Sequence, residues 1–247
     1  MKQEARKLFA ELEMEFQPVA IKFHYSEPEG VEHIEKQLPF CAFLYEAQRD
    51  NKVFYTTKEN DLCNGKLILG MVPFSTFYAS GIVGKDYDIY KTQGGNAKIY
   101  KEFTPMIPGT VNYVQFSPVS LCDFDPDLII CFANTLQAEI LMRATSYISG
   151  DLWESKSSSV MSCAWTYMHP YNTGKVNFLI TGMHNGLKKL GIYPPGMHII
   201  SIPYQKIQEV IQALGEMDWE LLSFKEDPES KAKFQAIRDR WETIRKD

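Results

Sequence analysis

The sequence predicts a single α+β domain with a mixed sheet and packed helices, followed by a helical extension at the C-terminus. An α/β arrangement is the alternative. Of the 247 residues, 45% are hydrophobic and 23% are charged, which is the balance of a globular protein with a sizeable core. Strand-like and helix-like segments follow one another without an internal repeat or a low-complexity linker. We therefore expect one domain over residues 1–217 and a helical extension over 218–247.

The first elements expected along the chain are a helix and a strand. Apolar side chains recur at helical spacing over residues 5–16, and Pro18 is expected to end this helix. Residues 18–25 then alternate between apolar and polar side chains, as in a strand with one buried face. The pattern further predicts a helix at 39–50, a short strand at 53–57, a helix from near Cys63 and two short helices between Pro73 and Pro108.

The middle of the chain contains a strand and a helix with strong local signals. Residues 128–133 are apolar without alternation, which is typical of a strand buried on both faces. Asn134 and Gln137 have the spacing of a capping box, so a helix should begin there and end before Gly150. The remaining elements expected are strands at 110–117, 176–181 and 197–202, a helix carrying Cys163 and a helix opened by Pro203.

The last predicted helix has an apolar face and interleaved charges of both signs. Its apolar side chains are Phe234, Ile237, Trp241 and Ile244. We expect a solvated helix that packs on the body of the domain or on a partner subunit, which leaves a homo-oligomer open.

Composition and charge exclude several classes of protein. The formal charge is −5, so there is no basic excess with which to bind nucleic acid broadly. The opening residues are charged throughout, unlike a signal peptide, and no apolar run has the length needed to span a bilayer. Five cysteines are an odd and sparse set, unlike a disulfide scaffold. We therefore expect reduced thiols, a cytoplasmic location, and neither nucleic acid nor membrane as a partner.

Three cysteines lie at similar positions in the sequence, which could make their thiols reactive or able to bind a metal. The sequence contains no G-x-x-x-x-G-K-[ST], G-x-G-x-x-G, H-E-x-x-H, G-x-S-x-G or C-x-x-C motif, so any metal site must be assembled from distant residues. Cys41, Cys63 and Cys163 each lie at a predicted helix start, where free N–H groups and the helix dipole favour the thiolate. If the three converge, they could hold an iron–sulfur cluster and leave one iron for another ligand or a substrate.

His184 is the candidate for that further role. It lies in a glycine-rich segment after a predicted strand, where it could ligate a metal or face a substrate. The metal-site hypothesis thus comprises Cys41, Cys63, Cys163 and His184. The alternative for the cysteines is that they are buried as small apolar residues without a role. Cys131 is expected in the core, and Cys122 in a turn beside acidic residues.

Two other functions remain open, with catalytic and ligand-binding residues unassigned. One is a small-molecule-binding module without redox chemistry, and the other is a thiol-based enzyme with one nucleophilic cysteine. For the binding module, the candidate pocket residues are the aromatic side chains Phe74, Phe77, Tyr78, Tyr87, Tyr90, Tyr100 and Phe103.

Several short motifs occur together in an order that resembles a known family. They are PVAIKF (18–23), FC (40–41), CNG (63–65), FDPDLII (124–130), Cys163 and IPYQKI (202–207). Over residues 15 to 215 the chain resembles the uncharacterised family catalogued as domain of unknown function 169, which is found largely in anaerobic bacteria and archaea and has no established reaction.

The resemblance singles out Cys41, Cys63 and Cys163 as cysteines of the family type. The family often has a further cysteine followed by glycine and arginine where this chain has TGMHNG (181–186), so neither that cysteine nor that arginine carries over. His184 lies close enough to substitute for the missing ligand. An acidic residue usual before the last strand is also absent here, near Gly196.

Overall fold

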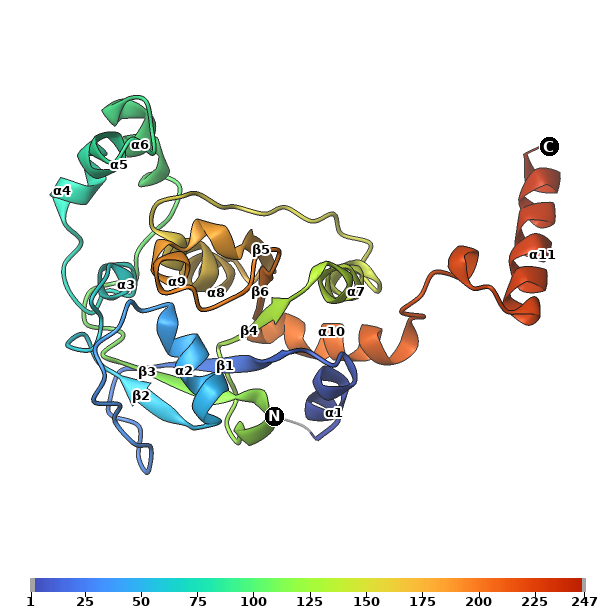
Figure 1. Cartoon of the computed structure of the whole chain (residues 1–247), viewed down its shortest axis with the longest axis horizontal. Helices are drawn as coiled ribbons and strands as arrows, with labels where there is room; N and C mark the ends of the chain where they lie inside the picture. The colour runs from blue at the N-terminus through green and yellow to red at the C-terminus, as the bar shows by residue number, and fades with distance from the viewer. Residues whose placement is uncertain (1–2, 246–247) are drawn as a thin grey trace.

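The computed structural model describes residues 3–245, and it confirms the α+β prediction with one globular domain and a C-terminal helix. A six-stranded sheet of order β2-β3-β1-β4-β6-β5 runs through the domain, with helices on both of its faces (Figure 1). The outer ends of the predicted ranges 1–217 and 218–247 lie outside the described residues, and the boundary between the two ranges stays a prediction.

All neighbouring strands in the sheet pair antiparallel. Parallel pairing is present in two isolated bridges, His33 to Tyr55 and Leu38 to Asp61. The strands are β1 (Phe16–His24), β2 (Phe54–Thr56), β3 (Tyr113–Pro118), β4 (Leu128–Ala133), β5 (Asn177–Ile180) and β6 (His198–Pro203).

The central strand β4 divides the core into two parts. All six of its residues are buried, as its unbroken apolar run predicts. Because successive side chains point to opposite faces, Leu128, Ile130 and Phe132 join one cluster, which we call the near core. The alternate residues, which include Cys131, join the other cluster, the far core. Cys131 is therefore a core residue, as predicted.

Each core is covered by its own set of helices. Residues of α1 (Gln3–Glu11), α7 (Thr135–Ser146) and α10 (Tyr204–Glu216) supply the far core. The near core receives α2 (Ala42–Asp50), α3 (Gly65–Ile68), a π-helix (Ala164–Met168) that runs into α8 (His169–Thr173), and α9 (Asn185–Leu190). A lobe of three short helices, α4 (Thr76–Ala79), α5 (Ile82–Asp86) and α6 (Gln93–Ile99), projects from the body (Figure 1). Short 3-10 helices are present at Val119–Leu121, Thr181–Met183 and Leu222–Phe224.

Local signals in the sequence were accurate at some elements and wrong at others. Asn134 and Gln137 form both hydrogen bonds of the predicted capping box at the start of α7. Pro18, however, does not end the first helix, which stops at Glu11. Pro18 lies inside β1, where the register with β4 is interrupted between Phe16 and Val19, and a proline is tolerated in a strand at such an irregularity. The segment between Pro73 and Pro108 forms three short helices, whereas two were expected.

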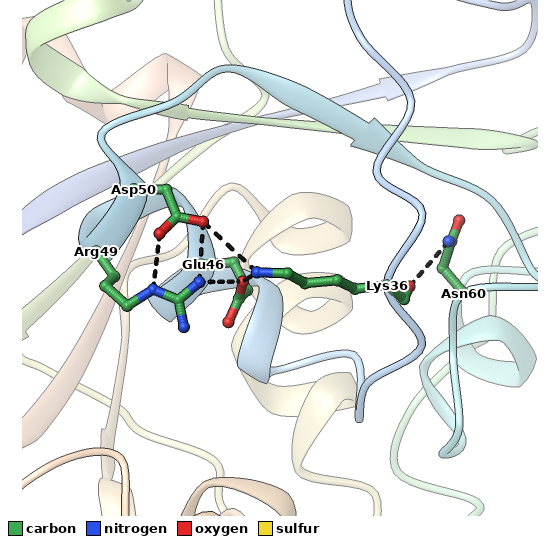
Figure 2. A network of polar contacts seen from close by, with 5 residues as sticks. All are labelled: Lys36, Glu46, Arg49, Asp50 and Asn60. Atoms are coloured by element: carbon green, nitrogen blue, oxygen red, sulfur yellow. Dashed lines mark hydrogen bonds and ion pairs between the residues drawn. The ribbon is translucent and has the colours of Figure 1, made fainter.

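An ionic network around the buried Glu46 connects α2 to the segment before it (Figure 2). Glu46 is buried on α2 and pairs with Lys36 and with Arg49, whose Nη2 lies 2.8 Å from Oε2. The Lys36 carbonyl accepts a hydrogen bond of 3.0 Å from Asn60, which is itself buried. Since Asn60 also accepts from the Thr57 N–H, the network joins α2 to the turn that leads to Cys63.

The C-terminal helix α11 (Pro228–Ile244) stands apart from the body (Figure 1). None of its residues is buried, and Trp241 and Ile244 of its apolar face are exposed. It therefore does not pack on the body, and packing on a partner subunit stays a prediction. Within residues 3–245, each helix falls short of the length and apolar character that crossing a bilayer requires.

Candidate functional site

Cys41 lies at the N-terminus of α2, as predicted, and is buried. The turn that starts the helix is closed by a 2.8 Å hydrogen bond from the Ala42 N–H to the Pro39 carbonyl. Cys41 belongs to the near core, with an exposed fraction of 5%. The thiol thus faces the protein interior.

Asp61 holds the segment of Cys63 against the segment of Cys41. Its buried carboxylate accepts hydrogen bonds from the backbone N–H groups of Phe40 at 3.1 Å, Cys63 at 2.8 Å and Lys66 at 2.8 Å. Burial raises the pKa of Asp61, while these backbone donors act to lower it by stabilising the charged form. One carboxylate therefore connects the two motifs FC and CNG.

Gly65, the glycine of the CNG motif, lies in close contact with Phe40. A Cβ at this position would lie 2.4 Å from Cβ of Phe40 and 2.5 Å from its Cγ. The absence of a side chain lets α3 approach the residue that precedes Cys41. Cys63 itself is exposed, one residue before the N-cap Asn64 of α3.

Cys163 comes from a segment that lies a hundred residues after Cys63 in the sequence. It is the residue before the π-helix and lies in the first turn of the helical segment 162–173, as the prediction of a helix start requires. It is buried in the near core. Single turns of π-helix are rare and occur often at functional sites.

His184 is buried, with an exposed fraction of 1%, although its glycine-rich surroundings suggested an accessible loop. It precedes α9, and its Nε2 lies 2.8 Å from Oγ1 of Thr166 on the π-helix. Burial lowers the pKa of His184 to about 4, so the imidazole is neutral at neutral pH. Because Nε2 is hydrogen-bonded to Thr166, Nδ1 is the ring nitrogen that remains for another partner.

The four candidate residues line one pocket of about 140 Å³. The segments that carry them also contact one another: a Cβ on Gly186, two residues after His184, would lie 3.0 Å from Sγ of Cys41. Besides these four, the pocket is lined by Asn64, Ile68, Tyr78, Val83, Tyr87, Ile89, Tyr100, Ser159, Val160, Met161, Ser162, Asn185 and Gly186.

Three of the seven aromatic candidates also line this pocket. Tyr78 lies in α4, and Tyr87 and Tyr100 directly follow α5 and α6, so all three come from the projecting lobe. The other four, Phe74, Phe77, Tyr90 and Phe103, do not line it. The cysteine site therefore shares its pocket with three of the seven aromatic candidates.

The expectation that the three thiols favour the thiolate is wrong. Burial raises the pKa of Cys41 to about 12, with further contributions from Cys63 and Asp61. Burial also raises the pKa of Cys163, and the Cys41 and Cys63 thiols add to this effect. Partial desolvation raises the pKa of Cys63 as well, although the residue as a whole is exposed. Loss of solvation outweighs the small stabilisation that a helix N-terminus provides.

A single metal ion is a poor fit to these side chains. Among residues 3–245, no group of three or more His, Cys, Asp and Glu side chains is arranged to hold one ion. In a four-iron cluster each thiolate binds a different iron atom, so the ligands of such a cluster lie further apart than the ligands of one ion. The soft sulfur donors suit iron–sulfur chemistry.

Sequence reasoning missed several residues that support the site. Asp61 bonds three backbone groups of two segments, which its place in the sequence does not predict. Thr166 and Tyr167, which lies beside Phe40, gave no signal because the π-helix that orients them has no sequence signature. Cys122 and Cys131 lie in the far core, across the sheet from Cys41 and Cys163, which supports leaving both out of the site.

The burial of the thiols predicts their order of alkylation in the metal-free protein. Cys63 should react with iodoacetamide first, because it is exposed whereas Cys41 and Cys163 are buried. All three should react at similar rates in urea. Peptide mass spectrometry over time measures this order, and reaction of Cys41 or Cys163 in the folded protein as fast as that of Cys63 would contradict the described site.

Comparison with known proteins supports the family resemblance. A family model for the domain of unknown function 169, described as "Uncharacterised ArCR", matches residues 7–213, which include the four candidate residues. The chain is also similar to uncharacterized protein MJ0308 of Methanocaldococcus jannaschii, at 23% identity over 223 residues that cover 87% of this chain and 93% of that protein. None of the solved structures matches the chain. Because the family match spans most of the chain, this protein belongs to the domain of unknown function 169 family.

Proposed function

We propose that Cys41, Cys63 and Cys163 hold an iron–sulfur cluster and that the protein is a redox or metal-binding protein. The observation that carries this proposal is that three cysteines and His184, from four separate segments, line one pocket. The four residues come from four separate segments of the chain, and sulfur and imidazole are both donors that bind iron.

The buried thiols of the pocket would need a positively charged occupant in order to ionise. Each buried thiol resists ionisation, and the neighbouring thiols and Asp61 increase that resistance. Iron offsets the negative charge that accumulates when the thiols ionise together. Because protons compete for the same sulfurs, cluster binding should weaken as the pH falls.

His184 has the protonation state that a ligand requires. Its lowered pKa keeps the ring neutral. In the tautomer whose Nε2–H donates to Oγ1 of Thr166, Nδ1 is the nitrogen that can bind the iron that the three cysteines leave open, or accept from a substrate. Tyr78, Tyr87 and Tyr100 line the same pocket. A substrate bound there would contact both His184 and the aromatic rings.

The second candidate function is binding of a small organic molecule without a cluster. No Asp, Glu, Lys or Arg is among the residues that line the pocket, and Tyr78, Tyr87 and Tyr100 supply aromatic surface. This lining favours an uncharged ligand. The third candidate, a nucleophilic cysteine, is disfavoured because the pKa values of all three thiols are raised.

We also propose a cytoplasmic location. Its support is the sparse, odd set of five cysteines, all of them free in the structure, since thiols stay reduced in that compartment.

The test is anaerobic reconstitution with ferrous iron and sulfide. We expect the protein to bind both, to develop broad visible absorption, and to lose them when Cys41, Cys63 or Cys163 is replaced by serine. Cys122→Ser is the matched control, because Cys122 lies across the sheet and serine can keep its hydrogen bond to the Phe124 carbonyl.

Two outcomes would count against the cluster. A colourless protein without iron after reconstitution would exclude it, and loss of iron in Cys122→Ser as large as in the pocket variants would place it elsewhere. If the protein stays colourless but an uncharged aromatic compound shifts its tyrosine fluorescence, the second candidate function becomes the better one.

A further inference from the structure

The C-terminal helix α11 has an apolar face that the rest of residues 3–245 leaves largely exposed. None of the 17 residues of the helix is buried, and Trp241 and Ile244 are 47% and 63% exposed. Phe234 and Ile237 lie on the same face and are half-buried. Most helical stability in proteins comes from the packing of such a face, since a helix of this length is marginal in water by itself. The helix is therefore suited to a surface beyond its own domain.

The segment that connects α10 to α11 is anchored to the body. Arg143 of α7 donates to the carbonyl oxygens of Asp218 and Trp219, both at 2.7 Å. The indole N–H of Trp219 donates to the carbonyl of Leu214 at 2.9 Å, and Lys225 pairs with Asp218 at 2.9 Å. The helix α11 thus extends from a fixed point and stands apart from its own domain (Figure 1).

The body exposes a second apolar surface, which we call the α7 patch. It consists of four side chains at the C-terminus of α7 and in the segment that follows: Tyr147, Ile148, Leu152 and Trp153. Their exposed fractions are 52%, 46%, 92% and 51%. Grouped exposed apolar side chains mark interaction surfaces, whereas scattered ones are ordinary. A second copy of the chain therefore presents an apolar surface that α11 could cover.

The charges beside the two surfaces are opposite in sign. At helical spacing, Lys233 and Arg240 border the apolar face of α11 on one side, and Arg238 borders it on the other. Asp151 lies within the segment of the α7 patch, and the chain as a whole has a formal charge of −5. A basic rim on the helix thus complements an acidic domain. An anionic membrane fits less well, because it would repel that domain.

We propose that α11 is a dimerisation arm, and that each of two copies of the chain packs its α11 on the α7 patch of the other. In a two-fold dimer of this kind the contact forms twice, since each copy gives one arm and receives one. Exchange of an identical element between copies is a low-cost route to a dimer. The proposal does not depend on what occupies the cysteine pocket.

Sedimentation equilibrium of the full chain tests the dimer. We expect the wild type to be a dimer, and we expect Trp241→Ala and Leu152→Glu each to raise its dissociation constant about tenfold or more. The first variant removes a large aromatic contact, and the second places a charge in an apolar one. Both residues are exposed, so the circular dichroism spectra should match that of the wild type. Ile107→Glu is the matched control, because Ile107 is 73% exposed and belongs to neither surface.

A mixture of the two variants identifies the contacting surfaces. Trp241→Ala keeps an intact α7 patch and Leu152→Glu keeps an intact arm, so the mixture should form a heterodimer through one contact although each variant alone is a monomer. If Leu152→Glu remains a dimer, the arm does not pack on the α7 patch and the proposal is overturned. A wild type that stays a monomer at its highest soluble concentration overturns it too. A monomer that binds phosphatidylserine vesicles through Trp241 would assign the arm to a membrane instead.

Discussion

Acidification should destabilise the metal-free protein by about 3 kcal/mol through His184 alone. The pKa of this histidine is about 4 in the folded protein, against about 6.5 for an exposed histidine. Between these two values the unfolded chain binds a proton that the folded chain does not, so the free energy of unfolding falls as the pH falls. The stability is fully present above about pH 6.5 and is lost by about pH 4.

Urea unfolding at a series of pH values measures this loss. His184→Gln is the informative variant, because glutamine can keep a hydrogen bond to Thr166 but does not titrate. It should be less sensitive to acid than the wild type. His169 and His198 contribute in the same direction, since burial lowers the pKa of both. An equal acid sensitivity of His184→Gln and wild type would show that His184 is not the group responsible.

Gly65→Ala should destabilise the fold by about 1–3 kcal/mol and disrupt the site. The added Cβ would lie 2.4 Å from Cβ of Phe40. Phe40 cannot easily move, because its ring packs against Phe43, Phe116 and Tyr167 at centroid distances of 6.2, 5.7 and 5.1 Å. Relief of the clash must therefore shift α3, and with it Cys63.

Gly215→Ala is the control for this change. Gly215 lies inside α10, and a Cβ there would meet no atom within 4 Å. Alanine should stabilise this position by about 0.5–1 kcal/mol, because it is the better helix former. Urea unfolding measures both variants, and iron loading should fall only in Gly65→Ala. Gly65→Ala with wild-type stability and iron content would mean that α3 does not depend on the contact with Phe40.

Much of the secondary structure could be predicted because its signals are local. The capping box at Asn134 and the unbroken apolar run of β4 depend on residues a few positions apart, and both predictions are confirmed. Pro18 was misread because a proline in a strand and a proline after a helix look alike until the register of the neighbouring strand is known. The π-helix that carries Thr166 and Tyr167 has no local signature at all.

The sequence by itself determined where the three cysteines lie in their own segments, at or next to the N-termini of helices. Only the tertiary structure decided that these segments and His184 meet in one pocket. It also decided how the thiols ionise, because a helix start is a local feature whereas desolvation depends on every segment that covers the sulfur. Burial reversed the shift that was expected in the pKa of Cys41. A bound cation would favour the thiolate of Cys41 again, and the sequence alone could not place such a cation.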